Sequence, residues 1–366
     1  MINLFNTQIE NLSLHKVGNK SRNEAVLLSK EPYKLNDEIT PLLKEFFFKP
    51  FREKKEVYFQ FAHEVDLEYN EMYKLCTKLF NRQGDNTHTI SEKITKHLFE
   101  QSNHPHIKSG EVYVTYLTNV VIDNHVVDAI GIFKSEIKSD FIQVDAVDTN
   151  KSKGMFPQPE NIVLNMNLQQ GISLDKLDKG CIIFNYKKEE GYKILCVDSN
   201  KYDSRYWLDH FLGLNEFEDE NFLTSKYLKF AQQFAKEVVL PATDKQNEVM
   251  FKNKTIHHFA TNDEFDEQKY MESLFDELPD LLPEFKAYKA DKGGKYSVDD
   301  ITTFPISNAM VNDLRSSYKS AIKLDTNMEI KLDFVNPESA ANFLEKGYDE
   351  EKQMYYYLCY FNKETK

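Results

Sequence analysis

The side chains of this sequence that could act together chemically are lysines between residues 223 and 259. That stretch holds six lysines against three acids. An ammonium group that contacts a phosphate displaces condensed counterions, so clustered lysines are typical of a surface that binds nucleic acid. Lys226, Lys229 and Lys236 gather on one side of a helical wheel, opposite an apolar side. The same basic surface would include Lys245, Lys252 and Lys254. A solvated helix face is the alternative interpretation.

Further basic side chains could extend this surface. Predicted loops at strand ends carry Lys151, Lys153, Lys187 and Lys188, which are either phosphate contacts or ordinary solvated lysines. Arg205 stands beside Trp207, the only tryptophan, in an aromatic cluster that could stack on unpaired bases. The cluster could equally be a knot in the core, with Trp207 buried and Arg205 paired to an aspartate.

No catalytic or metal-binding pattern is visible. His97, His104 and His106 are near one another in sequence, but their spacing matches no established zinc site. The stretch 110–147 at the centre of the predicted fold has no Gly-rich phosphate loop, no nucleophile elbow and no pair of ligands at metal spacing. Carboxylates that a two-metal nuclease could use occur at Asp145, Asp148, Asp175, Glu189 and Glu190, and nothing in the sequence brings them together. We predict no catalytic residue, no metal and no cofactor.

The charge balance limits how DNA could be bound. The chain carries 46 basic and 59 acidic residues, a net charge of -13. Residues 1–262 hold 33 and 37 of them, whereas residues 263–366 hold 13 and 22. This excess argues against a general DNA-coating protein, and any nucleic-acid surface has to be a local patch. The acidic stretch 263–291 either aids solubility or acts as an electrostatic guard or DNA mimic.

Composition indicates a globular protein of the cytoplasm. Hydrophobic residues make up 41% of the 366 residues. No apolar run reaches the length of about 18 residues that a membrane span needs, and the N-terminus lacks the pattern of a secretory signal. The four cysteines are far apart with no C-x-x-C pair, so we expect buried free thiols.

The centre of the predicted fold is a β-meander over residues 110–147. Its first two runs are apolar on successive residues, which indicates strands covered on both faces. We predict an α+β protein with a mixed, mostly antiparallel sheet flanked by helices, followed by a helical segment and a small α+β C-terminal region. The predicted domains are residues 1–222 and 223–366.

Pattern and turn signals predict the other elements of the first domain. We expect strands near 9–17, 24–29, 161–167, 181–186 and 192–197. Helices are predicted from Asn36 or Asp37 to Pro50, over 69–80, from a capping box at Thr89, and over 206–212.

The second domain is predicted to be mainly helical. A long helix starts near Thr224 and breaks at Pro241, and a capping box at 243–246 opens the next. Helices interrupted at Pro279 and Pro283 follow, and then a turn at 292–295. The remaining predicted elements are a helix at 307–314, a hairpin of 320–325 with 328–334, a helix at 337–344 and a strand at 354–361.

Several segments together resemble one bacterial family. The segments are His97–Ser102, Gly110–Val114, Asp128–Ser135, Ser225–Phe230 and Phe304–Ile306. They are similar to the 37-kDa nucleoid-associated protein family, in the form common in Bacteroidetes, and the likeness covers roughly residues 1–360. It rests on distributed pattern rather than on a catalytic motif. Members are described as cytoplasmic proteins of the nucleoid and are not known as enzymes.

The resemblance and the lysine stripe together lead to a functional expectation. We expect a non-enzymatic protein of the cytoplasmic nucleoid that contacts DNA largely independently of sequence. A homodimer is expected, with other nucleoid or DNA-maintenance proteins as possible partners and no membrane partner. The alternative is a protein-interaction adaptor that a partner recruits to DNA and that has no DNA affinity of its own.

Overall fold

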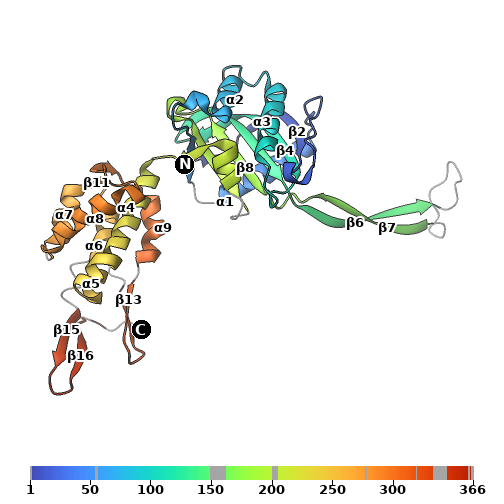
Figure 1. Ribbon diagram of the computed structural model, residues 1–366. Helices are drawn as coiled ribbons and strands as arrows, with labels where there is room; N and C mark the ends of the chain where they lie inside the picture. The colour runs from blue at the N-terminus through green and yellow to red at the C-terminus, as the bar shows by residue number, and fades with distance from the viewer. Residues whose placement is uncertain are drawn as a thin grey trace. The chain divides into compact units, whose positions relative to one another are not determined.

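The chain folds into two compact units, Met1–Phe217 and Glu218–Lys366 (Figure 1). The structure, a computed structural model, describes residues 2–53, 57–148, 162–199, 205–276, 278–318, 320–332, 344–361 and 363. Each unit has hydrophobic clusters drawn from its own residues. The architecture confirms the predicted α+β class.

Unit 1 is built on one antiparallel sheet. Its strand order is β1-β4-β5-β8-β9-β3-β10, with β2 also paired to β4. The strands are β1 (Ile2–Asn3), β2 (Gln8–Val17), β3 (Tyr58–Phe61), β4 (Gly110–Ile122), β5 (His125–Ser135), β8 (Lys179–Phe184), β9 (Lys193–Asp198) and β10 (Leu214–Glu216). Each of these pairings is antiparallel.

The central strands are buried on both faces, as their continuous apolar runs predict. Along β4, Val112 and Val114 point into one hydrophobic cluster, and Tyr113 points into the other. Helix α1 (Ile39–Glu53) covers the second face, where the Phe47 ring stacks on Phe133 with centroids 4.3 Å apart. The first face is covered by α2 (Glu71–Phe80), α3 (Thr87–Gln101) and the π-helix η5 (Tyr206–Leu212).

The predicted three-stranded meander is wrong at its third strand. Strand β6 (Lys138–Asp148) leaves the sheet and pairs with β7 (Ile162–Ile172) in a separate two-stranded hairpin, while β8 takes the place beside β5. The chain turns away at the end of β5, where the Asp178 carboxylate accepts the backbone N–H groups of Glu136 and Ile137 at 2.7 and 3.1 Å. Such a long-range contact leaves no periodic signal in the sequence.

Three local expectations in unit 1 also differ from the structure. Residues 24–29 form no strand, only one bridge between Lys16 and Leu27. Pro50 lies inside the last turns of α1, where its missing N–H costs the helix one hydrogen bond without ending it. Helix α3 begins at Thr87, two residues before the predicted capping box. The other short helices in the described part of unit 1 are η1 (Lys20–Arg22), η2 (Leu67–Tyr69) and η4 (Lys188–Glu190).

Unit 2 packs helices around an aromatic core. Its helices are α4 (Glu220–Phe234), the π-helix η6 (Ala235–Val239), α5 (Leu240–Ala242), α6 (Lys245–Thr261), α7 (Glu267–Phe275), α8 (Leu281–Tyr296) and α9 (Asn308–Tyr318). Three two-stranded sheets complete it: β11 (Glu264–Asp266) with β12 (Thr303–Pro305), β13 (Ser320–Lys323) with β14 (Glu329–Leu332), and β15 (Leu344–Asp349) with β16 (Met354–Cys359).

Several glycines and prolines of unit 2 that predict turns or helix ends in the sequence lie inside helices in the structure. The predicted turn at 292–295 is helical and forms the end of α8. Pro283 lies in the first turn of α8, a position that tolerates proline, so only the break at Pro279 is confirmed. Helix α4 begins at Glu220 under an Asp219 cap rather than near Thr224, and the helical run continues past Pro241 to Ala242. The helix predicted at 337–344 lies outside the described residues, except Leu344, which begins β15.

His15 makes the stability of unit 1 sensitive to acid. Its Nδ1 accepts the Ser29 N–H at 3.1 Å, and its Nε2 lies 2.8 Å from the Ser91 hydroxyl. Burial, with a smaller contribution from nearby His88, lowers the pKa of His15 from 6.5 to about 4. The unfolded chain therefore takes up a proton at a pH where the folded chain does not. The stability contribution is complete above pH 6.5 and is lost as the pH falls toward 4.

We predict that unit 1 loses about 2 kcal/mol of its free energy of unfolding between pH 7 and pH 5 through His15 alone. Trp207 is fully buried in unit 1, so its fluorescence during urea unfolding reports this unit. The His15→Gln variant serves as the comparison, because the acid-induced loss should be smaller in it. Equal losses in both proteins would contradict the assignment.

Candidate nucleic-acid interface

The apolar face predicted for the long helix of unit 2 is present in α4. Tyr227, Phe230 and Phe234 are fully buried, and the Tyr227 ring lies 4.2 Å from that of Phe265. This packing fixes the rotation of the helix about its axis. The lysines on the other side are thereby turned away from the core, which is the orientation that a phosphate-binding surface needs.

The three lysines of α4 and η6 differ in their surroundings. Lys229 and Lys236 are exposed, and neither forms an ion pair with a described residue. Lys226 is half-buried, with its ammonium 4.7 Å from the centroid of the Phe222 ring. The two exposed cations are thus the most accessible part of the predicted stripe.

The lysines of α6 are held differently from those of α4. Lys245 and Lys252 both pair with the buried carboxylate of Glu248, at 2.5 Å in the case of Lys252. Burial opposes ionisation of Glu248, but hydrogen bonds from the two ammonium groups hold its pKa below the ordinary value. Lys254 is half-buried and nine residues beyond Lys245, which places it about 180° around the helix. The structure therefore does not bring the six lysines onto one face.

Two lysines that the sequence interpretation missed lie beside α4. Lys292 and Lys295 are exposed in the last turns of α8, and both act electrostatically on Glu237 of η6. The Tyr288 hydroxyl, also on α8, donates to Glu237 at 2.7 Å and joins the two helices. Treating residues 292–295 as a turn concealed this placement. Extending the predicted helix through Gly293 and Gly294 would have placed the two lysines on α8.

The remaining predicted contacts lie in unit 1 or outside the described residues. Lys187 and Lys188 are exposed at the turn between β8 and β9, and Lys187 pairs with Glu190 at 3.2 Å. Lys151 and Lys153 fall within 149–161, which the structure does not describe. No described contact joins Lys187 or Lys188 to the α4 lysines.

The aromatic cluster around Trp207 is part of the core of unit 1. Trp207 is fully buried and packs 5.0 Å from Phe211, so its ring is not available to stack on a base. Arg205 is exposed beside it and lines a hollow of about 550 Å³ with Tyr206 and several other side chains. Those others include His104, His106 and His210.

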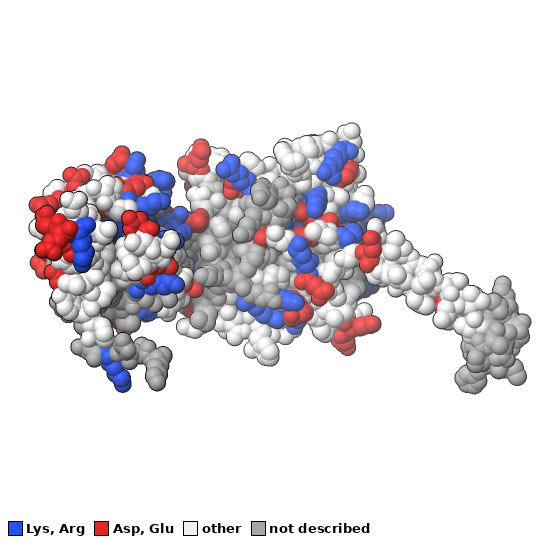
Figure 2. Space-filling model, turned by 90° about the horizontal axis from the view of Figure 1, so that it is seen from below, with Lys and Arg blue, Asp and Glu red and all other residues white. Residues whose placement is uncertain are grey.

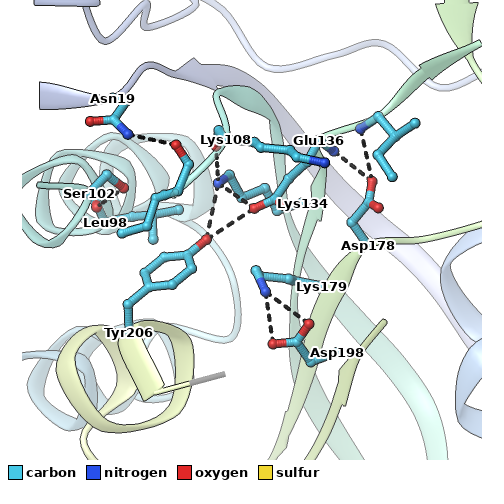
Figure 3. A network of polar contacts seen from close by, with 12 residues as sticks. Asn19, Leu98, Ser102, Lys108, Lys134, Glu136, Asp178, Lys179, Asp198 and Tyr206 are labelled. Carbon is cyan, nitrogen blue, oxygen red and sulfur yellow. Dashed lines mark hydrogen bonds and ion pairs between the residues drawn. The ribbon is translucent and has the colours of Figure 1, made fainter. Parts of the chain in front are cut away.

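Three lysines of unit 1, Lys134, Lys179 and Lys193, are buried and therefore unavailable to phosphate. Lys134 donates to Glu136 and the Lys108 carbonyl at 2.7 Å each and to the Tyr206 hydroxyl at 3.1 Å (Figure 3). Burial lowers the pKa of Lys134, and the Glu136 carboxylate opposes that shift. Lys179 donates to both oxygens of Asp198 at 2.8 Å. These ion pairs neutralise buried ammonium groups. The sequence alone does not distinguish such buried lysines from lysines at the surface.

Within the described part of the chain no group of three or more His, Cys, Asp or Glu side chains could hold a metal ion. The His97 Nε2 lies 3.0 Å from the Phe211 carbonyl oxygen, which gives that ring a structural contact. The cysteines are free thiols, and Cys76 and Cys181 are buried as expected. Cys359 is exposed, contrary to the expectation of burial. No described helix is long and apolar enough to cross a membrane.

Acidic and basic side chains are intermixed on the side of the molecule that Figure 2 shows. In the same view Figure 2 shows a dense acidic group in unit 2, where Figure 1 places α7. Several acids there are engaged in the fold: Glu267 accepts from the Tyr227 hydroxyl at 2.8 Å and from Lys289 at 2.6 Å. Part of the acidic stretch is therefore structural.

Comparison with models of known protein families shows which family the chain belongs to. The family model described as nucleoid-associated protein YejK matches residues 13–355. The chain belongs to this family. The match spans both units and agrees with the likeness inferred from the sequence segments, while the Bacteroidetes form is not distinguished by it. No significant match occurs among curated proteins.

We predict that Glu248→Gln lowers the free energy of unfolding by about 2 kcal/mol, because two ammonium groups lose a buried carboxylate. Urea unfolding followed by far-UV circular dichroism measures the change. Glu264→Gln is the matched control, since Glu264 is exposed at the start of β11. A Glu248 variant as stable as the control would show that the pair contributes nothing.

Proposed function

We propose that this protein is a non-enzymatic component of the bacterial nucleoid in the cytoplasm, and that it binds DNA phosphates largely independently of sequence. The proposed surface consists of Lys226, Lys229, Lys236, Lys292 and Lys295 on α4, η6 and α8 of unit 2. Family membership supports the nucleoid role. The exposure of Lys229, Lys236 and Lys295 supports direct contact, and Lys292 is exposed as well but pairs with Asp291 at 3.1 Å.

The charge of the whole molecule sets the expected strength of this contact. With five ammonium groups on phosphates, the slope of log affinity against log salt would be about -4 to -5. The net charge of -13 repels DNA, and this repulsion opposes contact over a wide area of the protein. We therefore propose a small, salt-sensitive footprint rather than a wrapped or coated duplex. We further propose that the protein acts as a homodimer and meets other nucleoid or DNA-maintenance proteins.

A specific observation favours a second candidate, the adaptor that reaches DNA through a partner protein. Glu248 neutralises Lys245 and Lys252, and Lys346 pairs with Asp244 at 3.2 Å. Half of the predicted lysine stripe is thus in ion pairs or on another side of α6. An adaptor would need no cationic surface, and its partner would supply the DNA affinity.

We predict that changing Lys226, Lys229 and Lys236 together to Glu abolishes measurable binding at moderate salt and flattens the salt slope by about three. Fluorescence anisotropy of labelled duplex DNA over a salt series measures both quantities. A labelled single strand of equal length shows the preference between the two forms.

The control for this experiment carries the same charge change elsewhere. Lys78, Lys93 and Lys96 are exposed on α2 and α3 of unit 1, and their replacement by Glu alters net charge equally. The control should keep the slope of the wild type. Equal weakening in both triple variants would place the contact elsewhere, and a wild-type slope near zero would favour the adaptor.

A further inference from the structure

The hairpin β6–β7 has one apolar face that no described residue of unit 1 covers. Its eleven pairs run from Lys138 opposite Ile172 to Asp148 opposite Ile162. Directly opposed residues share a face, and faces alternate along a strand. One face therefore carries three consecutive apolar pairs: Ile142 with Leu168, Val144 with Met166, and Ala146 with Leu164.

These side chains are unusually exposed. Met166 is 75% exposed, Leu168 71%, Leu164 67% and Ile142 65%. The opposite face is mixed: it carries Gln143, Asp145, Asn165, Asn167 and Gln169, and also Phe141, Val147 and Val163, which are 45–51% exposed. Figure 2 shows the hairpin, called the arm below, as a projection from the body of unit 1 with few charged side chains on the side in view. A contiguous apolar face of this kind marks an interaction surface.

The arm is firmly attached at its base. Asp178 holds the N–H groups of Glu136 and Ile137, Lys138 pairs with Glu111, and Ile172 packs against a core cluster of unit 1. A two-stranded hairpin alone is marginally stable in water, and it needs further strands or another packed element to persist. We therefore expect the apolar face to be covered by a partner that is not part of unit 1.

Charge excludes a polyanion as that occupant. The described strands of the arm carry Asp140, Asp145 and Asp148, against one lysine that already pairs with Glu111. The apolar pairs have no cation among them. The occupant must itself present an apolar face of similar length whose charges lie only at its ends, where Asp140 and Asp148 lie on this face.

We propose that the occupant is the same face of a second copy of this chain, so that two arms stack antiparallel, face to face. Homo-oligomers are most often two-fold symmetric, with one patch meeting itself. A two-fold axis at the Val144–Met166 pair places Ile142 against Ala146 of the second copy and Leu168 against Leu164. The decrease in size from Ile142 through Val144 to Ala146 is complementary to itself in this arrangement.

The buried area fits a stable contact. Transfer energies imply that burying an aliphatic side chain removes roughly 60–120 Å² from water, so the three pairs contribute on the order of 500 Å² per copy. The polar rim adds to this, toward about 800 Å² per partner in interfaces of standard size. The proposal specifies the interface of the homodimer named under the proposed function. It does not depend on DNA binding, because the test contains no DNA.

Light scattering after size exclusion tests the proposal on the full chain at micromolar concentration. The wild type should elute at twice the chain mass of 43.0 kDa. Val144→Asp with Met166→Asp should shift it to the monomer. The control, Ser139→Asp with Gln169→Glu, adds equal charge to the opposite face and should remain dimeric. A monomeric wild type, or a dimer that the apolar-face variant leaves intact, would overturn the proposal.

Cross-linking distinguishes this geometry from a dimer that the aspartates disrupt by unfolding the arm. In a Cys359→Ser background, which removes the exposed native thiol, a short bis-maleimide should join Val144→Cys to itself across the axis. Ile142→Cys should cross-link only when Ala146→Cys is also present. Efficient cross-linking of Ile142→Cys alone would contradict the antiparallel register.

Discussion

Burial of β4 and β5 on both faces is the constraint on which unit 1 depends. Two neighbouring strands with apolar side chains on each side cannot rest on a single layer of helices. Helix α1 therefore covers one face, and α2, α3 and η5 cover the other. Segments far apart in the chain are drawn in by this requirement, and the charged side chains Lys134 and Lys179 enter the interior with carboxylate partners.

The burial of charged pairs changes how the composition should be interpreted. Counting lysines along the chain treats every ammonium as part of the surface, yet Lys134, Lys179 and Lys193 are buried in ion pairs within unit 1. In unit 2 the same happens around Glu248. The positive charge available to a phosphate is therefore smaller and more local than the sequence total suggests.

Periodicity was sufficient for much of the fold. The spacing of apolar residues identified α2, the buried face of α4 and both central strands, because those patterns follow directly from packing on one or two sides. It failed at β6, where the chain leaves the sheet beside a contact with Asp178, a residue distant in sequence. It also failed where glycine or proline was taken as a stop, at Pro50 and at Gly293 and Gly294, because tertiary packing outweighs local preference.

The proposed basic surface was predictable only in part for the same reason. Amphipathic spacing located Lys229 and Lys236, which need nothing beyond the helix itself. Lys292 and Lys295 are included in the proposed surface because α8 packs on α4, where Tyr288 contacts both Phe230 and Phe234. Pairing of Lys245 and Lys252 with Glu248 was likewise visible only after folding.

The position of β10 has a consequence for biosynthesis. This strand closes the edge of the sheet against β3, and Phe217 just beyond it packs into the core under α1. Unit 1 therefore cannot complete its core until the ribosome has synthesised residue 217. At that point every residue of unit 1 has been made. Domains generally fold as units from the N-terminus during synthesis. The helices of the second unit would accordingly emerge beside a neighbour whose apolar strands are already shielded.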